Sequence, residues 1–299
     1  MPMNDCPQIG EQLRSKNILV LPGVYDSLSA LMAEQAGFQT AYLSGAAIAY
    51  TRFGRPDIGL IGMTEVAETI AVINERAAVR LVVDGDTGFG NALNVMRTVR
   101  RFEAAGAAAI QLEDQSQPKR CGHLSGKTLV PAGEMVGKIK AAVDARHSEQ
   151  MLIVARTDGI AVEGFEAALD RADRYAEAGA DILFVEAPQS TEQMVEIVKR
   201  FGGRIPLLAN MVEGGKTPQK DAQSLEDLGF SLVIFPGGLV RAFVPMAENY
   251  MSSLKKHGST QPFQNQMHDF ENLNKRLGTN EMLQLGAQYD ARKFEVTND

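Results

Sequence analysis

The chain has no tryptophan, and its 299 residues include only two cysteines and four histidines. Cys6 and Cys121 are too few for a disulfide framework, which favours a reducing, cytoplasmic setting. No histidine has the spacing to a cysteine pair that a zinc site needs. The sequence also lacks an apolar run of about 20 residues and a secretory signal pattern, so we expect neither a membrane span nor export.

Neither positive nor negative charge is concentrated in any one part of the sequence. The formal net charge is −7, and acidic and basic residues are interspersed. The absence of a basic stripe or arginine-rich arm argues against nucleic acid as a partner. The hydrophobic content of 44% is that of an ordinary globular protein, and the length suits a single α/β barrel.

Short apolar runs alternate with longer amphipathic segments along most of the chain. The runs predicted to be strands are 18–21, 40–43, 81–84, 109–112, 152–156, 182–185, 207–210 and 232–235. The segments predicted to be helices are 27–36, 64–76, 92–105, 133–146, 165–178, 191–201 and 239–256. Four glycines close helices just before strands: Gly37, Gly106, Gly179 and Gly229.

Eight strands alternating with helices predict a parallel sheet closed into a (β/α)8 barrel. The alternative is an open, doubly wound sheet, but no Gly-x-Gly-x-x-Gly motif follows the first strand. We therefore expect a catalytic barrel domain over residues 1–257. Residues 258–262 are small, polar and turn-forming, and predicted helices at 263–277 and 281–285 follow with no strand between them. This helical tail, 258–299, is predicted to pack on a neighbouring subunit or on the outside of the barrel.

The third predicted strand ends in two acids among glycines, Asp84-Gly85-Asp86-Thr87-Gly88-Phe89-Gly90. Carboxylates at the rim of a sheet, with little side-chain bulk around them, suit Mg²⁺ or Mn²⁺. A plain tight turn is the alternative interpretation. In a barrel the active site lies where the strands end, and acids or amides follow most of the predicted strands. The polar residues after the other strands are Asp26, Ser44, Glu113, Asp114, Arg156, Asp158, Glu186, Asn210 and, further on, Arg241.

The connection after the fourth strand, residues 115–130, is unusually long for a barrel and is predicted to be a functional lid. It contains Lys119-Arg120-Cys121-Gly122-His123. A cysteine beside two basic residues is in the electropositive setting that lowers a thiol pKa. An inert, buried cysteine is the alternative.

Together these motifs resemble the isocitrate lyase/phosphoenolpyruvate mutase superfamily from Tyr25 to about His257. The matching motifs are Ser44-Gly45-Ala46, the Asp84–Gly90 stretch, Glu113-Asp114-Gln115, Lys119-Arg120-Cys121-Gly122-His123, Ala155-Arg156-Thr157-Asp158 and Asn210-Met211. The lid motif is similar to that of the carbon–carbon lyase branch, 2-methylisocitrate lyase-like and 2,3-dimethylmalate lyase-like. The resemblance implies a barrel whose last helix is exchanged between subunits of a homotetramer, a dimer of dimers.

The resemblance also implies a role for each matching residue. A Mg²⁺ or Mn²⁺ ion would be bound directly by Asp84, and its waters would be held by Asp57, Asp86 and Glu113. The residues expected to take part in catalysis are Cys121, which protonates the departing carbanion, His123, Arg156 and Glu186. The residues expected to bind substrate are Tyr42, Ser44, Gly45, Ala46, Lys119, Arg120, Gly122, Asn210 and Arg241.

The implied reaction is metal-dependent cleavage of a 2-hydroxy carboxylate to a 2-oxo acid such as pyruvate and a second carboxylate. Tyr42, or Glu113 through water, is a candidate for the base. Gln111 and Gly214 stand where methylisocitrate lyases generally have His and Phe, which favours a smaller substituted malate. The alternatives are oxaloacetate hydrolysis or decarboxylation, phosphonopyruvate chemistry, and a catalytically silent barrel that binds 2-oxo acids.

Overall fold

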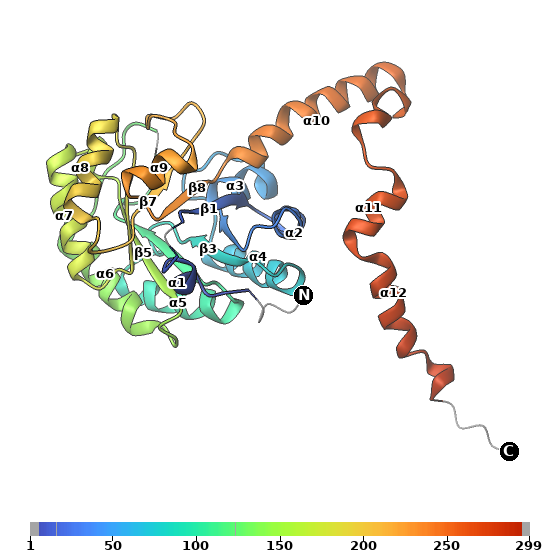
Figure 1. Ribbon diagram of the computed structural model, residues 1–299, viewed down its shortest axis with the longest axis horizontal. Helices are drawn as coiled ribbons and strands as arrows, with labels where there is room; N and C mark the ends of the chain where they lie inside the picture. The colour runs from blue at the N-terminus through green and yellow to red at the C-terminus, as the bar shows by residue number, and fades with distance from the viewer. Residues whose placement is uncertain (1–5, 16, 123, 295–299) are drawn as a thin grey trace. The chain divides into compact units, whose positions relative to one another are not determined.

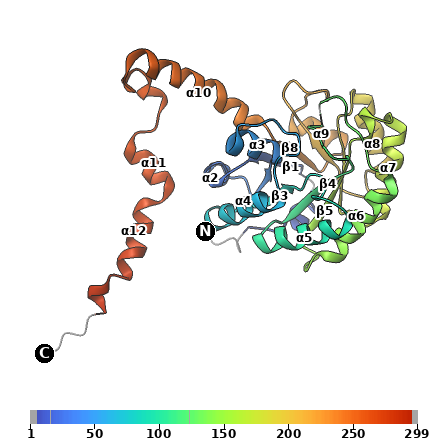
Figure 2. The ribbon, with the colours of Figure 1, turned by 180° about the vertical axis from the view of Figure 1, so that it is seen from behind.

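The computed structural model describes residues 6–15, 17–122 and 124–294, and it divides into two compact units, Met1–Arg241 and Ala242–Asp299. The first unit is a barrel of eight parallel strands surrounded by helices (Figure 1, Figure 2). The strands are β1 (Leu19–Val24), β2 (Thr40–Leu43), β3 (Arg80–Asp84), β4 (Ala109–Glu113), β5 (Leu152–Thr157), β6 (Ile182–Val185), β7 (Leu208–Asn210) and β8 (Leu232–Phe235). The predicted (β/α)8 barrel is confirmed.

The barrel wall closes with ladders of unequal strength. The strands follow one another in the order β6, β5, β4, β3, β2, β1, β8, β7. β1 and β8 pair from Leu19 opposite Leu232 to Pro22 opposite Phe235. In the described residues β6 and β7 share only an isolated bridge between Leu183 and Leu207. The wall therefore has one weak seam.

One helix precedes the first strand, and the others lie between and after the strands along the chain. They are α1 (Ile9–Gln12), α2 (Ser27–Gln35), α3 (Gly45–Phe53), α4 (Met63–Arg76), α5 (Ala92–Ala105), α6 (Ala132–Ala145), α7 (Phe165–Glu177), α8 (Thr191–Phe201), α9 (Ala222–Leu228) and α10 (Gly238–His257), with a 3₁₀ turn η2 (Gly159–Ala161). Gly106 and Gly229 end α5 and α9 with φ of 101° and 109°, as their positions before strands predict.

Every predicted strand lies on an observed one, and the largest difference is at β1. The pattern ends this strand at Leu21 because Pro22 and Gly23 usually interrupt strands. In the structure both belong to β1, and a Cβ on Gly23 would overlap the backbone of Pro236. Three short helices, α1, α3 and α9, lie outside the predicted ones, since four to nine residues carry little periodicity.

Two apolar layers hold the barrel together. One lies inside the ring of strands and includes Leu21, Val82, Val154 and Leu232, with Ile9 of α1 added to it. The larger layer lies between strands and helices, and its members include Phe102 of α5. Because both faces of the strands are buried, their sequences read as continuous apolar runs and not as alternating ones.

The second unit contains the end of α10 and then η3 (Gln261–Gln266), α11 (Phe270–Leu277), α12 (Thr279–Gln288) and η4 (Ala291–Lys293). The prediction of one helix over 263–277 is wrong, because Asp269 accepts a hydrogen bond from the Asn272 amide and starts α11 anew. Phe263 packs edge-on against Tyr250, at 5.4 Å between ring centroids. Neither α11 nor α12 buries a residue. The prediction of a barrel domain ending at residue 257 stays a prediction.

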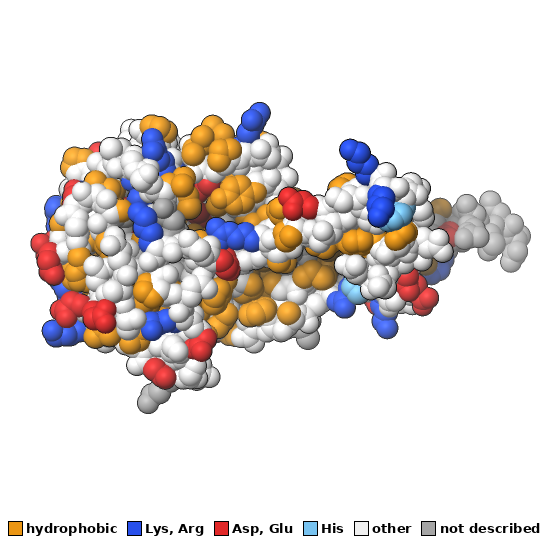
Figure 3. Space-filling view, turned by 90° about the horizontal axis from the view of Figure 1, so that it is seen from above, with side chains coloured by type: hydrophobic (Ala, Val, Ile, Leu, Met, Phe, Trp, Pro, Cys, Tyr) orange, Lys and Arg blue, Asp and Glu red, His pale blue; other side chains and the backbone are white. Residues whose placement is uncertain are grey.

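Apolar side chains are visible on the surface of both units (Figure 3). Among the described helices there is none with the length and apolarity needed to cross a membrane.

Candidate active site

A small cavity of about 50 Å³ lies at the carboxyl ends of the strands. It is lined by Tyr42, Ser44, Ala46, Asp57, Asp84, Glu113, Lys119, Arg120, Cys121, Gly122, Arg156, Asn210, Val212, Ile234 and Pro236. Most of the residues predicted to form the site therefore meet at one place. The lid residues from 119 to 122 form one side of the cavity, so the lid is closed over it.

Asp84 ends β3 opposite the start of α3. Its Oδ1 atom accepts hydrogen bonds from the Asp86 amide at 3.2 Å and from Gln111 Nε2 at 3.3 Å. The Oδ2 atom lies 3.1 Å from where a Cβ on Gly45 would stand. Ser44 caps α3 by accepting from the Ala47 amide at 3.2 Å, and the first amides of a helix have no acceptor within it. The start of α3 thus presents donors beside a carboxylate.

A buried polar chain connects Tyr42 to Asp84. The Tyr42 hydroxyl donates to Gln111 Oε1 at 2.8 Å, and the Gln111 amide in turn donates to Asp84. Burial raises the pKa of Tyr42 well above its ordinary value, and the Asp84 carboxylate adds to the effect. Tyr42 is therefore a neutral donor here, and Gln111 fixes which Asp84 oxygen faces the cavity.

Lys119 of the lid lies between two of the predicted metal-associated acids. Its ammonium is 2.5 Å from Asp57 Oδ1 and 2.7 Å from Asp86 Oδ1, and all three side chains are buried. Burial alone would lower the pKa of Lys119, but Asp86, Glu113 and the other acids raise it well above its usual value. Burial raises the pKa of Asp86 to about 7 against the opposing effect of Lys119. The predicted substrate-binding lysine therefore serves here as a counter-ion to the acids.

The remaining acids fit a hydrated cation. Glu113 Oε1 is buried and has no hydrogen-bond donor among the described residues, and burial raises the pKa of Glu113 although Arg156 opposes the shift. No three Asp, Glu, Cys or His side chains in the described ranges gather closely enough to chelate a metal by themselves. Mg²⁺ commonly takes only one or two carboxylates and keeps several waters. Asp84 Oδ2 with the unpaired Glu113 oxygen suits such an ion.

Arg156 extends from the end of β5 into the cavity. Its guanidinium donates to Asp158 at 2.9 Å and 3.1 Å, lies 3.6 Å from Glu186 Oε2 and 3.4 Å from Glu113 Oε2, and stacks 5.1 Å from the Phe184 ring centroid. Burial would raise the pKa of Asp158, but Arg156 and the lysine at 127 outweigh it and lower the pKa. The arginine is thus held in one orientation.

Glu186 follows β6 and Asn210 ends β7, the two strands at the weak seam. Asn210 Nδ2 donates to Glu186 Oε2 at 3.0 Å. Both were predicted from the strand ends, and the structure places them beside Arg156.

The lid is a hairpin-like loop held by its own backbone. Gln115 bridges to Leu129, and its side chain exchanges two hydrogen bonds with the Arg120 backbone, at 2.8 Å and 2.9 Å. Gln117 donates to Thr87 at 2.9 Å, which fastens the lid to the loop that carries Asp86. Cys121 is half-buried and lines the cavity. His123 lies outside the described residues.

Some predicted residues lie elsewhere. Arg241 is exposed at the start of α10 and pairs with Glu213 at 2.7 Å. Arg120 lines the cavity, but its guanidinium donates to the Ser125 carbonyl at 2.8 Å within the lid. Asp26 caps α2, as its turn interpretation predicts, and Gly214 does not line the cavity. The binding role predicted for Arg241 stays a prediction.

Two site residues were missed by sequence reasoning. Lys127 is buried and bonded to Asp158 at 2.7 Å. Gln111 was noted only as a difference from relatives, although its amide connects Tyr42 to Asp84. The available signal for Lys127 was a lysine inside the long lid, but a lysine in a loop is usually solvated.

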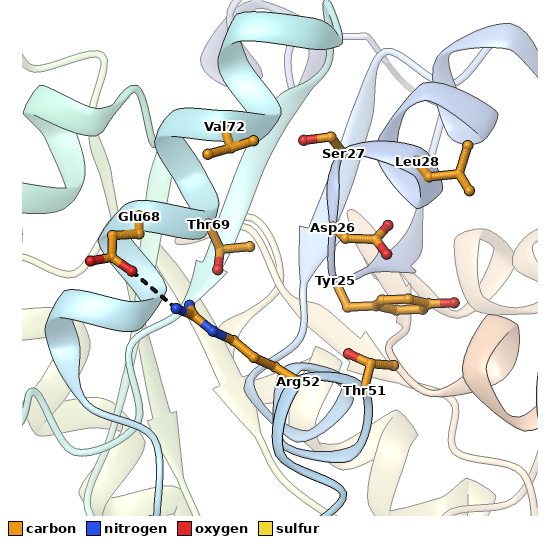
Figure 4. Close-up of a pocket in the computed structure, with 9 residues that line it drawn as sticks. All are labelled: Tyr25, Asp26, Ser27, Leu28, Thr51, Arg52, Glu68, Thr69 and Val72. Atoms are coloured by element: carbon orange, nitrogen blue, oxygen red, sulfur yellow. Dashed lines mark hydrogen bonds and ion pairs between the residues drawn. The ribbon is translucent and has the colours of Figure 1, made fainter. Parts of the chain in front are cut away.

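A second, larger groove of about 560 Å³ lies on the outside of the barrel among α2, α3 and α4 (Figure 4). Arg52 reaches across it to Glu68 at 3.1 Å, and the Val72 and Thr69 side chains of α4 lie on the side opposite Ser27. The Arg52–Glu68 ion pair is exposed, and the groove contains none of the acids of the mouth. The chemistry therefore belongs to the smaller cavity.

Comparisons with known proteins agree with this geometry. The family described as phosphoenolpyruvate phosphomutase matches residues 11–255. A 2,3-dimethylmalate lyase of Eubacterium barkeri is 41% identical over 289 residues, covering 96% of this chain and 99% of that protein. A 2-methylisocitrate lyase of Aeropyrum pernix is 49% identical over 249 residues, covering 83% of this chain and 79% of that protein.

Solved structures show the same fold. A crystal structure of 2,3-dimethylmalate lyase superposes with a TM-score of 0.89 at 33% identity and covers 97% of this chain and 96% of its own. A phosphonopyruvate hydrolase in complex with oxalate and Mg²⁺ superposes with a TM-score of 0.85 at 29% identity, covering 97% and 99%. The fold, the convergent mouth and these matches lead to one assignment: the chain belongs to the phosphoenolpyruvate mutase/isocitrate lyase superfamily.

Proposed function

We propose that the chain is a Mg²⁺-dependent carbon–carbon lyase acting on a 2-hydroxy carboxylate of the 2-alkylmalate or 2-methylisocitrate type. The products would be a 2-oxo acid such as pyruvate and a second carboxylate. The observation that carries the proposal is that Cys121 lines the same cavity as Asp84 and Arg156. A proton donor, a metal ligand and a carboxylate-binding cation thus face one small volume.

The proposed cleavage balances without an oxidant or reductant. The 2-hydroxyl group loses its proton, the C2–C3 bond breaks, and C2 becomes the carbonyl carbon of the 2-oxo acid. The bonding electron pair stays on C3, beside a carboxylate that delocalises the charge. The Cys121 thiol then gives its proton to C3 and is reprotonated before the next turnover.

When bound, Mg²⁺ would supply Lewis acidity for the charge that develops on the 2-oxygen. Asp84 would hold it directly, and Asp86, Asp57 and Glu113 would hold its waters. Of the two candidate bases Glu113 is the better supported, because Tyr42 is a neutral donor to Gln111. Glu113 has a raised pKa and a buried oxygen that no described donor occupies.

The chain's own residues would hold and enclose the substrate. Arg156 and the first amides of α3, at Gly45 and Ala46, suit the 2-oxo acid carboxylate, because guanidinium groups and helix N-termini bind anions. The lid backbone at Gly122 lies against Arg156 and Glu186, where it excludes water from the departing carbanion. Water exclusion also strengthens each electrostatic contact in the site.

A small substituted malate is the proposed preference over 2-methylisocitrate. Gln111, which stands where methylisocitrate lyases generally have His, is committed to Tyr42 and Asp84. One methylene in a pocket changes kcat/KM by roughly 10–200-fold, so the preference would be graded.

The test is a 2-oxo acid release assay over a panel of 2,3-dimethylmalate, other 2-alkylmalates, 2-methylisocitrate, oxaloacetate and phosphonopyruvate. We expect the substituted malates to be cleaved, with the highest kcat/KM for small alkyl groups. A much higher kcat/KM for 2-methylisocitrate would make the chain a methylisocitrate lyase. Turnover of oxaloacetate or phosphonopyruvate alone would replace the lyase proposal with a hydrolase.

We also propose a homotetramer in the cytoplasm. Two of the relatives are named as lyases, and the helices α11 and α12 of the second unit bury no residue of their own. Light scattering of the full chain tests the assembly.

A further inference from the structure

Lys127 is a buried lysine that the proposed reaction does not use. It lies at the returning end of the lid, and its side chain is 1% exposed. The ammonium donates to Asp158 Oδ1 at 2.7 Å and also to the carbonyl of Gly122. A buried ammonium costs free energy unless it is paired and hydrogen-bonded. The two acceptors therefore hold the Lys127 ammonium in this position.

One acceptor, Gly122, belongs to the lid, and the other, Asp158, holds Arg156. Asp158 is fully buried, and it binds Arg156 through two hydrogen bonds while its own amide donates to Asp114 at 2.9 Å. Gly122 belongs to the lid and directly follows the cysteine that lines the cavity. Lys127 therefore connects the lid backbone to the aspartate that orients the arginine.

The contact at Gly122 is close. A Cβ at this residue would overlap Nη2 of Arg156 and the side chain of Glu186. Glycine at this position therefore lets the lid backbone pass close to the arginine that Asp158 holds. The Gly122 carbonyl, turned to Lys127, fixes the path of the backbone and with it the position of Cys121.

We propose that Lys127 is a positioning residue that couples closure of the lid to the Arg156–Asp158 pair. It does not touch the reacting atoms. It acts by holding the Gly122 carbonyl and Asp158 together, which sets Cys121 over the cavity when Arg156 is correctly oriented. The inference deepens the proposed lyase function and rests on it for the role of Cys121.

The test is hydrogen exchange of the full chain without substrate, comparing wild type with Lys127→Met. Lid amides at Ser116, Arg120 and Leu124 donate to acceptors within the lid and report its closure. Loss of one charge-assisted hydrogen bond should speed their exchange by about tenfold or more. Exchange of the amides of β4 and β5 should stay unchanged.

The control is Arg146→Met, which removes a partly buried ion pair with Asp181 at 2.7 Å, far along the chain from the lid. It should leave lid exchange at the wild-type rate. If Lys127→Met does not fold, Lys127→Gln replaces it, since an amide still donates to Gly122 but carries no charge. Equal lid exchange in wild type and variant would overturn the proposal, as would faster exchange spread evenly over the barrel strands.

Kinetics separate positioning from a structural role. A displacement of about 1 Å at a reacting group costs on the order of 10²-fold, so kcat of Lys127→Met should fall by about that factor while KM changes little. Failure of the wild type to cleave any malate would refute the lyase function alone, because the exchange measurement needs no turnover.

Discussion

Cys121 is the single residue on which the proposed chemistry depends most. General acid catalysis is worth roughly 10²–10⁴-fold, so Cys121→Ala should lower kcat by at least that order. Binding of Mg²⁺ and pyruvate should change little, since Asp84 and Arg156 are untouched. Steady-state kinetics together with calorimetry would check both expectations.

Alkylation tests the role of Cys121 independently of mutation. Iodoacetamide should inactivate the enzyme, and oxalate with Mg²⁺ should protect it by holding the lid closed. A Cys6→Ser variant should behave like the parent, which assigns the effect to Cys121. Near-normal turnover by Cys121→Ala would make the thiol structural and move the hydrolase alternative ahead.

Metal binding, and with it activity, should depend on Asp84. Asp84→Asn keeps the shape of the side chain and should leave the fold intact, but it should abolish most activity and weaken Mn²⁺ binding measured by paramagnetic resonance. Asp144 is exposed on α6, away from the mouth, so Asp144→Asn should retain both. Full activity after exhaustive chelation would contradict the assignment.

The Asp158 carboxylate should contribute to the free energy of unfolding in a pH-dependent way. Its folded pKa is lowered because Arg156 and Lys127 outweigh the effect of burial. A lowered folded pKa stabilises the protein above the unfolded value of about 3.9, and this contribution disappears as the pH falls toward the folded value. The difference in unfolding free energy between wild type and Asp158→Asn should therefore shrink below about pH 4, measured by urea titration. A difference independent of pH would refute the expectation.

The sequence predicted which residue types gather at the mouth, because acids and amides after parallel strands must share one rim. It could not predict how they pair. The structure pairs Lys119 with Asp57 and Asp86, and the substrate-binding role expected of Lys119 stays a prediction. That pairing depends on the path of a 16-residue loop, and no periodicity in the sequence fixes such a path.

At the scale of elements, closure of the lid depends on Gly122, which has no side chain. Gly122→Ala adds a methyl group that would overlap Arg156 and Glu186, so the lid should fail to close fully. We expect a fall in kcat of about 10²-fold with little loss of thermal stability. Gly137→Ala on α6 is a matched control, because a Cβ there has nothing within 4 Å. Equal activity of the two variants would show that the lid tolerates the methyl group.

The strands and the long helices were predictable, whereas the short helices α1, α3 and α9 were not. Apolar runs and capping glycines placed all eight strands. The helix α3 was missed because Gly45-Ala46-Ala47 shows no polar face, although its start supplies the amides at the mouth. The break before α11 was missed because Asp269 in a polar segment is a weak signal until its capping bond is seen.

At the scale of the whole molecule, assembly is the main expectation that awaits measurement. The exposed apolar side chains of α11 and α12 include Phe270, Leu273, Met282 and Leu283. Burial of such side chains is worth about 1.5–3 kcal/mol each, so a partner surface should cover them. Light scattering should give four times the chain mass, and deletion of residues 258–299 should lower that number. A monomer at working concentration would contradict the homotetramer and the exchanged helix.

The single bridge between β6 and β7 makes that seam the softest part of the barrel wall. At the mouth the seam is fastened a second time, by the hydrogen bond from Asn210 to Glu186. A substrate that takes the Nδ2 atom of Asn210 or the Oε2 atom of Glu186 as its partner would release this hydrogen bond. The barrel wall at the mouth would then be looser while the substrate is bound than in the free protein.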